Sequence, residues 1–199
     1  MKTCAVFSLF LLVLFLPWSA MAQKGSENLI KNGDFEKFTG DNPDAWDTSN
    51  IPGTLTIVSA SKVCKSGLRA VKCEVKDFYG SIIAGFACQK NLPTEGKDVG
   101  LSGYFMVHSV GKDQGVIVLC FQNSSGSTVG TEEAYLDDTK AQFVPFSREV
   151  KAPSGAAAVQ VRLTILPDKG SENAHPGSYL ICDDLKLVAL VPKEKTLVQ

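Results

Sequence analysis

The stretch AAVQVRLTIL, residues 157–166, decides the class of fold. Its odd positions from 159 to 165 are aliphatic, and they alternate with Gln160, Arg162 and Thr164. Side chains along a β-strand point alternately to the two faces of a sheet, so this pattern predicts a strand with one apolar and one polar face. The segment is therefore expected to cover a hydrophobic core on one side only.

Similar stretches recur along the chain, separated by clusters of Gly, Pro, Ser, Asn and Asp that favour turns. No stretch has the periodicity of a long amphipathic helix, and no internal repeat or interdomain linker interrupts the pattern. Short strands without intervening helices predict an all-β sandwich or barrel in a single domain. The predicted strands span residues 55–60, 68–75, 81–89, 99–110, 115–122, 143–151, 157–166 and 179–190.

The N-terminus has the layout of a secretory signal peptide. An apolar run over residues 5–16 follows Lys2, and small residues at 20 and 22 precede a cleavage point before Gln23. A retained membrane anchor is the alternative, but the run is shorter than the roughly 20 apolar residues that span a bilayer. We therefore expect a signal peptide over 1–22, a domain over 23–191, a flexible tail over 192–199, and a secreted protein, extracellular or periplasmic.

The charges are nearly balanced, with 20 Lys and Arg against 21 Asp and Glu, and no basic cluster stands out. Nucleic acids and anionic membranes attract concentrated positive charge, so neither is an expected partner. No second long apolar run follows the signal peptide, so no membrane insertion is expected after cleavage.

Five cysteines remain after cleavage, and an odd number leaves at least one thiol free or shared with another chain. Cys64 and Cys73 are near enough in sequence to bridge a hairpin. Buried cysteines that act as small apolar side chains fit equally well. The pairing and the oligomeric state stay open.

The polar faces of three predicted strands contain candidate ligand-binding residues. If these strands are neighbours, their outer faces form a shallow groove in which an aromatic ring stacks on a sugar and polar groups bind its hydroxyls. An ordinary solvated sheet face is the alternative. The candidates are Tyr104, His108, Gln122, Gln160 and Arg162.

Asp183 falls in an apolar row when strict alternation is applied to residues 179–187. A buried carboxylate needs backbone N–H donors, a cationic side chain or a metal ion, because its transfer from water is costly.

Several landmarks, in this order, resemble a family of β-jelly-roll carbohydrate-binding modules of the family 4, 9 and 22 type. They are NLIKNGDFE at 28–36, PDAW at 43–46, SGLRA at 66–70, LSGYF at 101–105, APSGA at 152–156 and YLICDDLKL at 179–187. The resemblance covers nearly the whole mature chain and implies a two-sheet antiparallel jelly-roll sandwich, galactose-binding-like.

The resemblance also implies a structural calcium ion near the chain ends. Glu36 and Asp183 become its side-chain ligands, with backbone carbonyls near Ser66 or Gly67, a set of hard oxygen ligands that suits Ca²⁺. The alternative is that Asp183 accepts backbone hydrogen bonds and Glu36 lies on the surface. In the resembling family the position of Trp46 is structural, so we expect a core residue there.

No catalytic motif is present, and only His108 and His175 are available as imidazole bases. The sequence therefore predicts a secreted, non-catalytic module that recognises an oligo- or polysaccharide through the outer face of the sandwich. The alternative is a protein-interaction or structural module of a surface complex, and an enzyme that degrades polysaccharides is less favoured. Which sugar binds is not determined.

Overall fold

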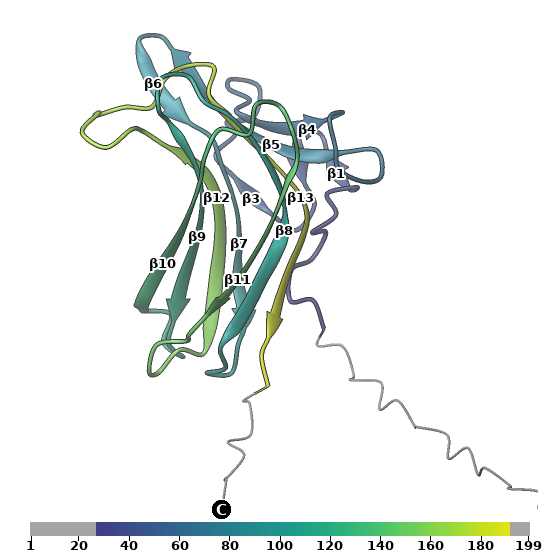
Figure 1. Cartoon of the computed structure of the whole chain (residues 1–199), viewed down its shortest axis with the longest axis vertical. Coiled ribbons are helices and arrows are strands. Elements are labelled where there is room, and N and C mark those ends of the chain that lie inside the picture. Colours follow the sequence, from purple (N-terminus) through teal and green to yellow (C-terminus); the bar gives the residue numbers. More distant parts are fainter. Residues whose placement is uncertain (1–26, 192–199) are drawn as a thin grey trace, which may run out of the picture.

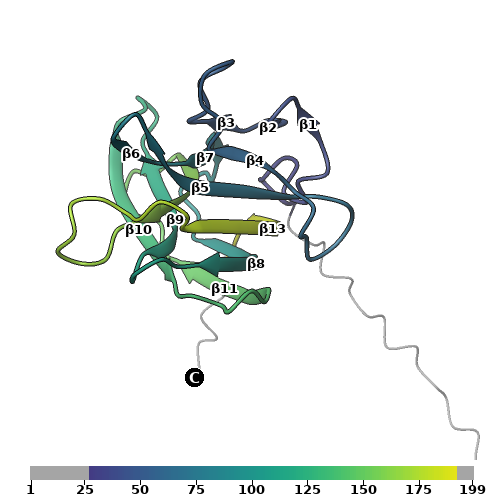
Figure 2. The same cartoon turned by 90° about the horizontal axis from the view of Figure 1, so that it is seen from above.

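The computed structural model describes residues 27–191, which form two antiparallel sheets packed face to face (Figures 1 and 2). The predicted signal peptide and C-terminal tail lie outside this range. The strands are β1 (Phe38–Thr39), β2 (Asn42–Pro43), β3 (Asp47–Thr48), β4 (Val58–Ser61), β5 (Ala70–Phe78), β6 (Ser81–Ala84), β7 (Phe86–Pro93), β8 (Val99–His108), β9 (Gln114–Gln122), β10 (Thr128–Leu136), β11 (Val144–Val150), β12 (Ala158–Leu166) and β13 (Tyr179–Ala189). The first sheet has the order β10-β9-β12-β7-β3, and the second has the order β11-β8-β13-β5-β4, with β6 paired to β5. Strands β1 and β2 form a separate two-stranded sheet.

The described residues contain no helix, so none is long and apolar enough to cross a membrane. The expected all-β antiparallel sandwich is confirmed. Its core lies between the sheets, where the alternating apolar residues of β8, β9 and β12 meet. Alternate residues of these three strands are buried there, including the apolar positions predicted for 159–165: Leu101, Phe105, Val107, Ile117, Leu119, Phe121, Val159, Val161, Leu163 and Ile165.

Strand β10, Thr128–Leu136, was not among the strands predicted from the sequence. It pairs with β9 through a hairpin whose turn is closed by Asn123, since Asn123 Oδ1 accepts hydrogen bonds from the Ser125 and Ser127 amides. β10 is an edge strand and is exposed along most of its length. An edge strand needs few apolar residues, so its sequence lacks the usual alternation.

Strand β13 corrects the predicted row of residues around Asp183. Its register slips between Asp183 and Lys186, and Asp184 adopts a positive φ of 51°. A bulge of this kind reverses which face the following side chains occupy. Asp183 therefore shares the outer face with Ile181, whereas Leu185 points into the main core.

All five described cysteines are free thiols, so the hairpin bridge considered between Cys64 and Cys73 is not formed. Cys73 and Cys182 are buried between the sheets, where burial raises the pKa of the Cys73 thiol to about 12. Trp46 is a core residue, as expected: its ring centroid lies 5.2 Å from that of Phe35, and its indole N–H donates to the Lys31 carbonyl at 3.2 Å.

Candidate functional site

The five predicted ligand-binding residues divide between the two sheets. Gln122 lies on β9, and Gln160 and Arg162 lie on the adjacent strand β12 of the first sheet. Tyr104 and His108 lie on β8, which pairs with β11 and β13 in the second sheet. The expected single groove containing all five is therefore wrong. Alternation gives the face on which a residue lies, but it does not reveal which sheet a strand joins.

Tyr104 and His108 interact with neighbours on their own face. The Lys65 ammonium lies 4.9 Å from the centre of the Tyr104 ring, and the His108 ring lies 5.1 Å from that of Tyr179. Lys72 covers Tyr179 at 4.5 Å. Neither predicted ring is therefore a bare platform for a sugar.

The outer face of the first sheet, here called the open face, collects polar side chains in cross-strand rows. Arg162 stands opposite Cys88 on β7 and Val118 on β9, and these pair in turn with Asp47 on β3 and Glu133 on β10. The open face comprises Asp47, Phe86, Cys88, Lys90, Val118, Cys120, Gln122, Thr131, Glu133, Tyr135, Gln160, Arg162 and Thr164.

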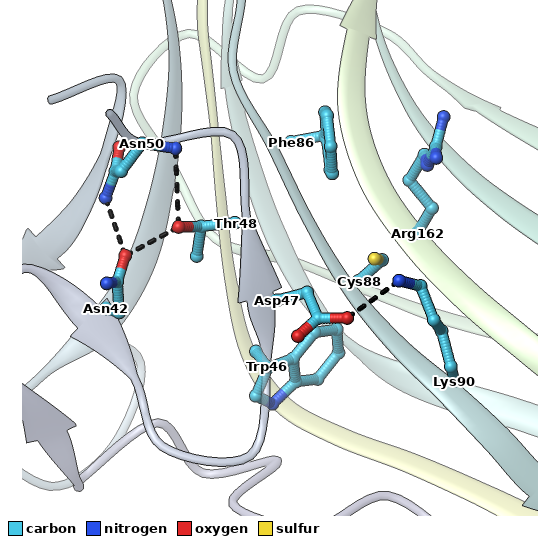
Figure 3. Close-up of a pocket in the computed structure, with 9 residues that line it drawn as sticks. All are labelled: Asn42, Trp46, Asp47, Thr48, Asn50, Phe86, Cys88, Lys90 and Arg162. Atoms are coloured by element: carbon cyan, nitrogen blue, oxygen red, sulfur yellow. Dashed lines mark hydrogen bonds and ion pairs between the residues drawn. The ribbon is translucent and has the colours of Figure 1, made fainter. Parts of the chain in front are cut away.

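A pocket of about 450 Å³ lies at the end of the open face where β3, β7 and β12 meet (Figure 3). On one side, Asn42 Oδ1 accepts hydrogen bonds from Thr48 Oγ1 at 2.5 Å and Asn50 Nδ2 at 2.8 Å. On the other side, Lys90 Nζ lies 2.8 Å from Asp47 Oδ2. Nine residues line this pocket: Asn42, Trp46, Asp47, Thr48, Asn50, Phe86, Cys88, Lys90 and Arg162.

The ionisable groups of the pocket have defined charge states. The hydrogen bond to Asp47 raises the pKa of Lys90, so this lysine stays cationic at neutral pH. Burial raises the pKa of the Cys88 thiol, which therefore stays protonated there. The pocket thus presents two cations and one carboxylate, without a thiolate nucleophile.

Several polar groups on strands β9 and β12 have no hydrogen-bond partner among the described residues. The Arg162 guanidinium lies 4.5 Å from the centre of the Phe86 ring, and its Nε is buried without a hydrogen bond. The side chains of Gln122 and Gln160 make no hydrogen bond within residues 27–191, although Gln160 is only 9% exposed. These groups have unused capacity to bind hydroxyls or anions.

The expected calcium ligands Glu36 and Asp183 are held by backbone amides instead. Glu36 Oε1 accepts from the Leu68 and Arg69 amides at 2.8 and 3.2 Å. Asp183 is fully buried, and its Oδ2 accepts from the Lys65 and Ser66 amides at 2.7 and 3.1 Å. Its Oδ1 accepts from the Asp184 amide at 2.8 Å.

This donor set does not fit a calcium ion bound directly by both carboxylates. The loop that contains Ser66 and Gly67 directs N–H groups at them, whereas Ca²⁺ requires oxygen ligands. Burial raises the pKa of Asp183 and the three amide hydrogen bonds oppose that rise, an arrangement that a backbone-bound carboxylate explains. Among residues 27–191, no three His, Cys, Asp or Glu side chains gather as a metal site. Calcium stays a prediction of the family resemblance.

Of the nine pocket residues, only Arg162 was a ligand-binding candidate from the sequence. Phe86 and Cys88 could have been found by extending strict alternation through residues 81–89, which places them on one face. Asp47 and Lys90 meet only because β3 pairs with β7, and the two residues of β3 carry no periodic signal.

No protein-family model matches this chain, and no curated protein matches it. Its fold is similar to that of a family 61 carbohydrate-binding module in complex with β-1,4-galactotriose, at 15% identity over 83% of this chain and 100% of that one, with a TM-score of 0.54. The CBM22-1 xylan-binding domain of Paenibacillus barcinonensis Xyn10C gives a TM-score of 0.55 at 13% identity, over 86% of this chain and 100% of that domain.

The enzymatically active domain of bacteriophage CBA120 tailspike protein 4 is also similar, with a TM-score of 0.59 at 14% identity over 82% of this chain. The chain spans only 21% of the length of that domain. The chain therefore has the jelly-roll β-sandwich fold of carbohydrate-binding modules, which confirms the fold predicted from the family landmarks. At identities this low, structural similarity shows the fold alone, and the ligand must be argued from the site.

Proposed function

We propose that this protein is a secreted, non-catalytic module that binds an oligo- or polysaccharide on the open face. The observation that carries the proposal is the set of unpartnered polar side chains on β9 and β12, beside the pocket formed with β3 and β7. Glycan sites combine such hydrogen-bonding groups with an apolar lining. The similar folds of modules that bind galactotriose and xylan support the same choice.

The arrangement of the histidines supports a non-catalytic role. His175 Nδ1 lies 2.9 Å from Asp113 Oδ1, but Ser178 donates its hydroxyl proton to Asp113 and not to the imidazole. A serine nucleophile needs a base within hydrogen-bond reach, which this cluster does not provide. The His108 ring lies 5.1 Å from the Tyr179 ring, and within residues 27–191 no hydrogen bond or ion pair joins its imidazole to a carboxylate. These contacts favour binding over catalysis.

A glycan array probed with residues 23–199 tests the proposal. We expect selective binding that falls about tenfold for Gln160→Ala, the loss expected when one well-placed hydrogen bond to a ligand is removed. The matched control is Tyr104→Ala, on the opposite sheet, which should bind as the wild type does. No binding by the folded protein, combined with capture of a protein partner, would favour the interaction-module alternative.

A further inference from the structure

Charge pairing within the pocket leaves Arg162 without a carboxylate. Of the three charged residues that line it, Asp47 is paired with Lys90 at 2.8 Å. Among residues 27–191, Arg162 forms no ion pair, and its Nε lacks a hydrogen-bond acceptor. A guanidinium in such a state gains most from a bidentate carboxylate, because charge-assisted hydrogen bonds are the strongest available to it.

The Arg162 side chain also covers the face of the Phe86 ring, on which a sugar could otherwise stack. Arg162 lies over the face of Phe86 at 4.5 Å from the ring centre, and Trp46 is buried in the core. The pocket therefore offers no bare aromatic plane for a neutral sugar to stack on. Its recognition chemistry is a cation backed by an aromatic ring, with Lys90 beside it (Figure 3).

We propose that this pocket binds an acidic sugar, a hexuronate residue whose carboxylate pairs with Arg162. The inference rests on the proposed function, because it specifies the ligand of the same face. The amide of Asn42, whose oxygen is already engaged, leaves its N–H groups to bind sugar hydroxyls at the other side of the pocket.

Besides Asp47, whose carboxylate is paired with Lys90, one further acidic group near Arg162 opposes the proposal. Glu133 stands in the same cross-strand row as Arg162, two strands away, which corresponds to roughly 10 Å at the usual spacing of neighbouring strands. Its carboxylate is hydrogen-bonded by Tyr135, and the interaction with a cation at that distance is largely screened at physiological salt. The anionic group is therefore expected at the Phe86 side of Arg162 and not at the β10 side.

The test compares oligogalacturonates with their methyl esters, in which each carboxylate is replaced by an uncharged ester, by calorimetric titration of residues 23–199. We expect the free acid to bind at least tenfold more tightly than the ester, and the difference to shrink as salt is raised from 0.05 to 0.5 M. Arg162→Gln should remove the preference, and Arg162→Lys should retain part of it.

Arg69→Gln is the matched control, because Arg69 also lies over a phenylalanine, Phe38 at 5.9 Å, but does not line the pocket. It should leave the preference unchanged. Equal binding of acid and ester, or preference for a sulfated polymer such as dextran sulfate, would overturn the hexuronate assignment while leaving glycan binding intact. Binding of no glycan, acidic or neutral, would overturn the proposed function as well.

Discussion

The two outer faces of the sandwich differ in how far their polar groups are satisfied by the protein itself. The outer face of the second sheet, here called the closed face, comprises Tyr104, Met106, His108, Tyr179, Ile181 and Asp183. Its centre is a small cluster of Ala70, Met106 and Ile181 against which Cys64 and Phe143 pack. On the open face, Arg162 Nε and the side-chain amides of Gln160 and Gln122 have no hydrogen-bond partner among the described residues.

The comparison shows that burial alone does not reveal a binding surface. Asp183 on the closed face is fully buried, and both of its oxygens accept hydrogen bonds, so no ligand is needed there. On the open face, Arg162 Nε is buried without a hydrogen-bond acceptor, and the Gln160 amide has no protein partner among the described residues. A ligand is expected where buried polar groups remain unpaired, because pairing them lowers the free energy.

The largest expected effect contrasts one residue from each face. Asp183→Ala should lower the free energy of unfolding by about 3 kcal/mol, because it leaves the Lys65, Ser66 and Asp184 amides without their acceptor. Gln122→Ala on the open face should change it by no more than about 0.5 kcal/mol. Urea unfolding of both variants measures the difference, and equal losses would contradict the contrast between the faces.

An intermediate effect on stability concerns Asp113, which joins its own loop to the segment that contains His175 and Ser178. Asp113 Oδ2 accepts from the His175 amide at 2.6 Å and the Ser178 hydroxyl at 2.7 Å. Burial alone would raise the pKa of Asp113, but the hydrogen bonds from Ser178 and His175 outweigh it and hold the pKa below its usual value. The stabilisation is therefore present above the unfolded pKa of about 3.9 and is lost as pH falls through the lower folded value.

Replacement of this carboxylate should flatten the acid side of the stability profile. We expect Asp113→Asn to lose less stability than the wild type as pH falls from 5 to below the unfolded pKa of about 3.9, because the folded pKa of Asp113 is lowered. Glu172→Gln, an exposed change in the neighbouring turn, is the control and should keep the wild-type slope. Urea unfolding at each pH measures these slopes. Identical slopes for all three proteins would rule out Asp113 as the source of the stability lost at acid pH.

The smallest expected effect is that of calcium on the closed face. Backbone amides already donate hydrogen bonds to the carboxylates of Glu36 and Asp183. The melting temperature in calcium should therefore exceed that in EDTA by no more than about 3 °C, or about 1 kcal/mol. Loss of that rise in Glu36→Gln would support the calcium predicted from the resemblance. A melting temperature that is the same in calcium and EDTA would contradict it.

Much of the sandwich could be predicted because strand alternation is a local property of the chain. The alternation over residues 157–166 predicted the buried set of that strand correctly. The edge strand β10 was missed because an exposed strand has no apolar face to signal it. The row around Asp183 was assigned wrongly because a bulge at Asp184 reverses the alternation without a distinctive sequence.

The candidate site was only half predictable for the same reason. By itself, the sequence determined that Gln122, Gln160 and Arg162 point away from the core, since the period of two along a strand fixes the face of each residue. Only the tertiary structure decided that Tyr104 and His108 lie on the opposite sheet and that Asp47 meets Lys90. The order of strands in a sheet follows from contacts between segments far apart in the chain, and no local pattern encodes it.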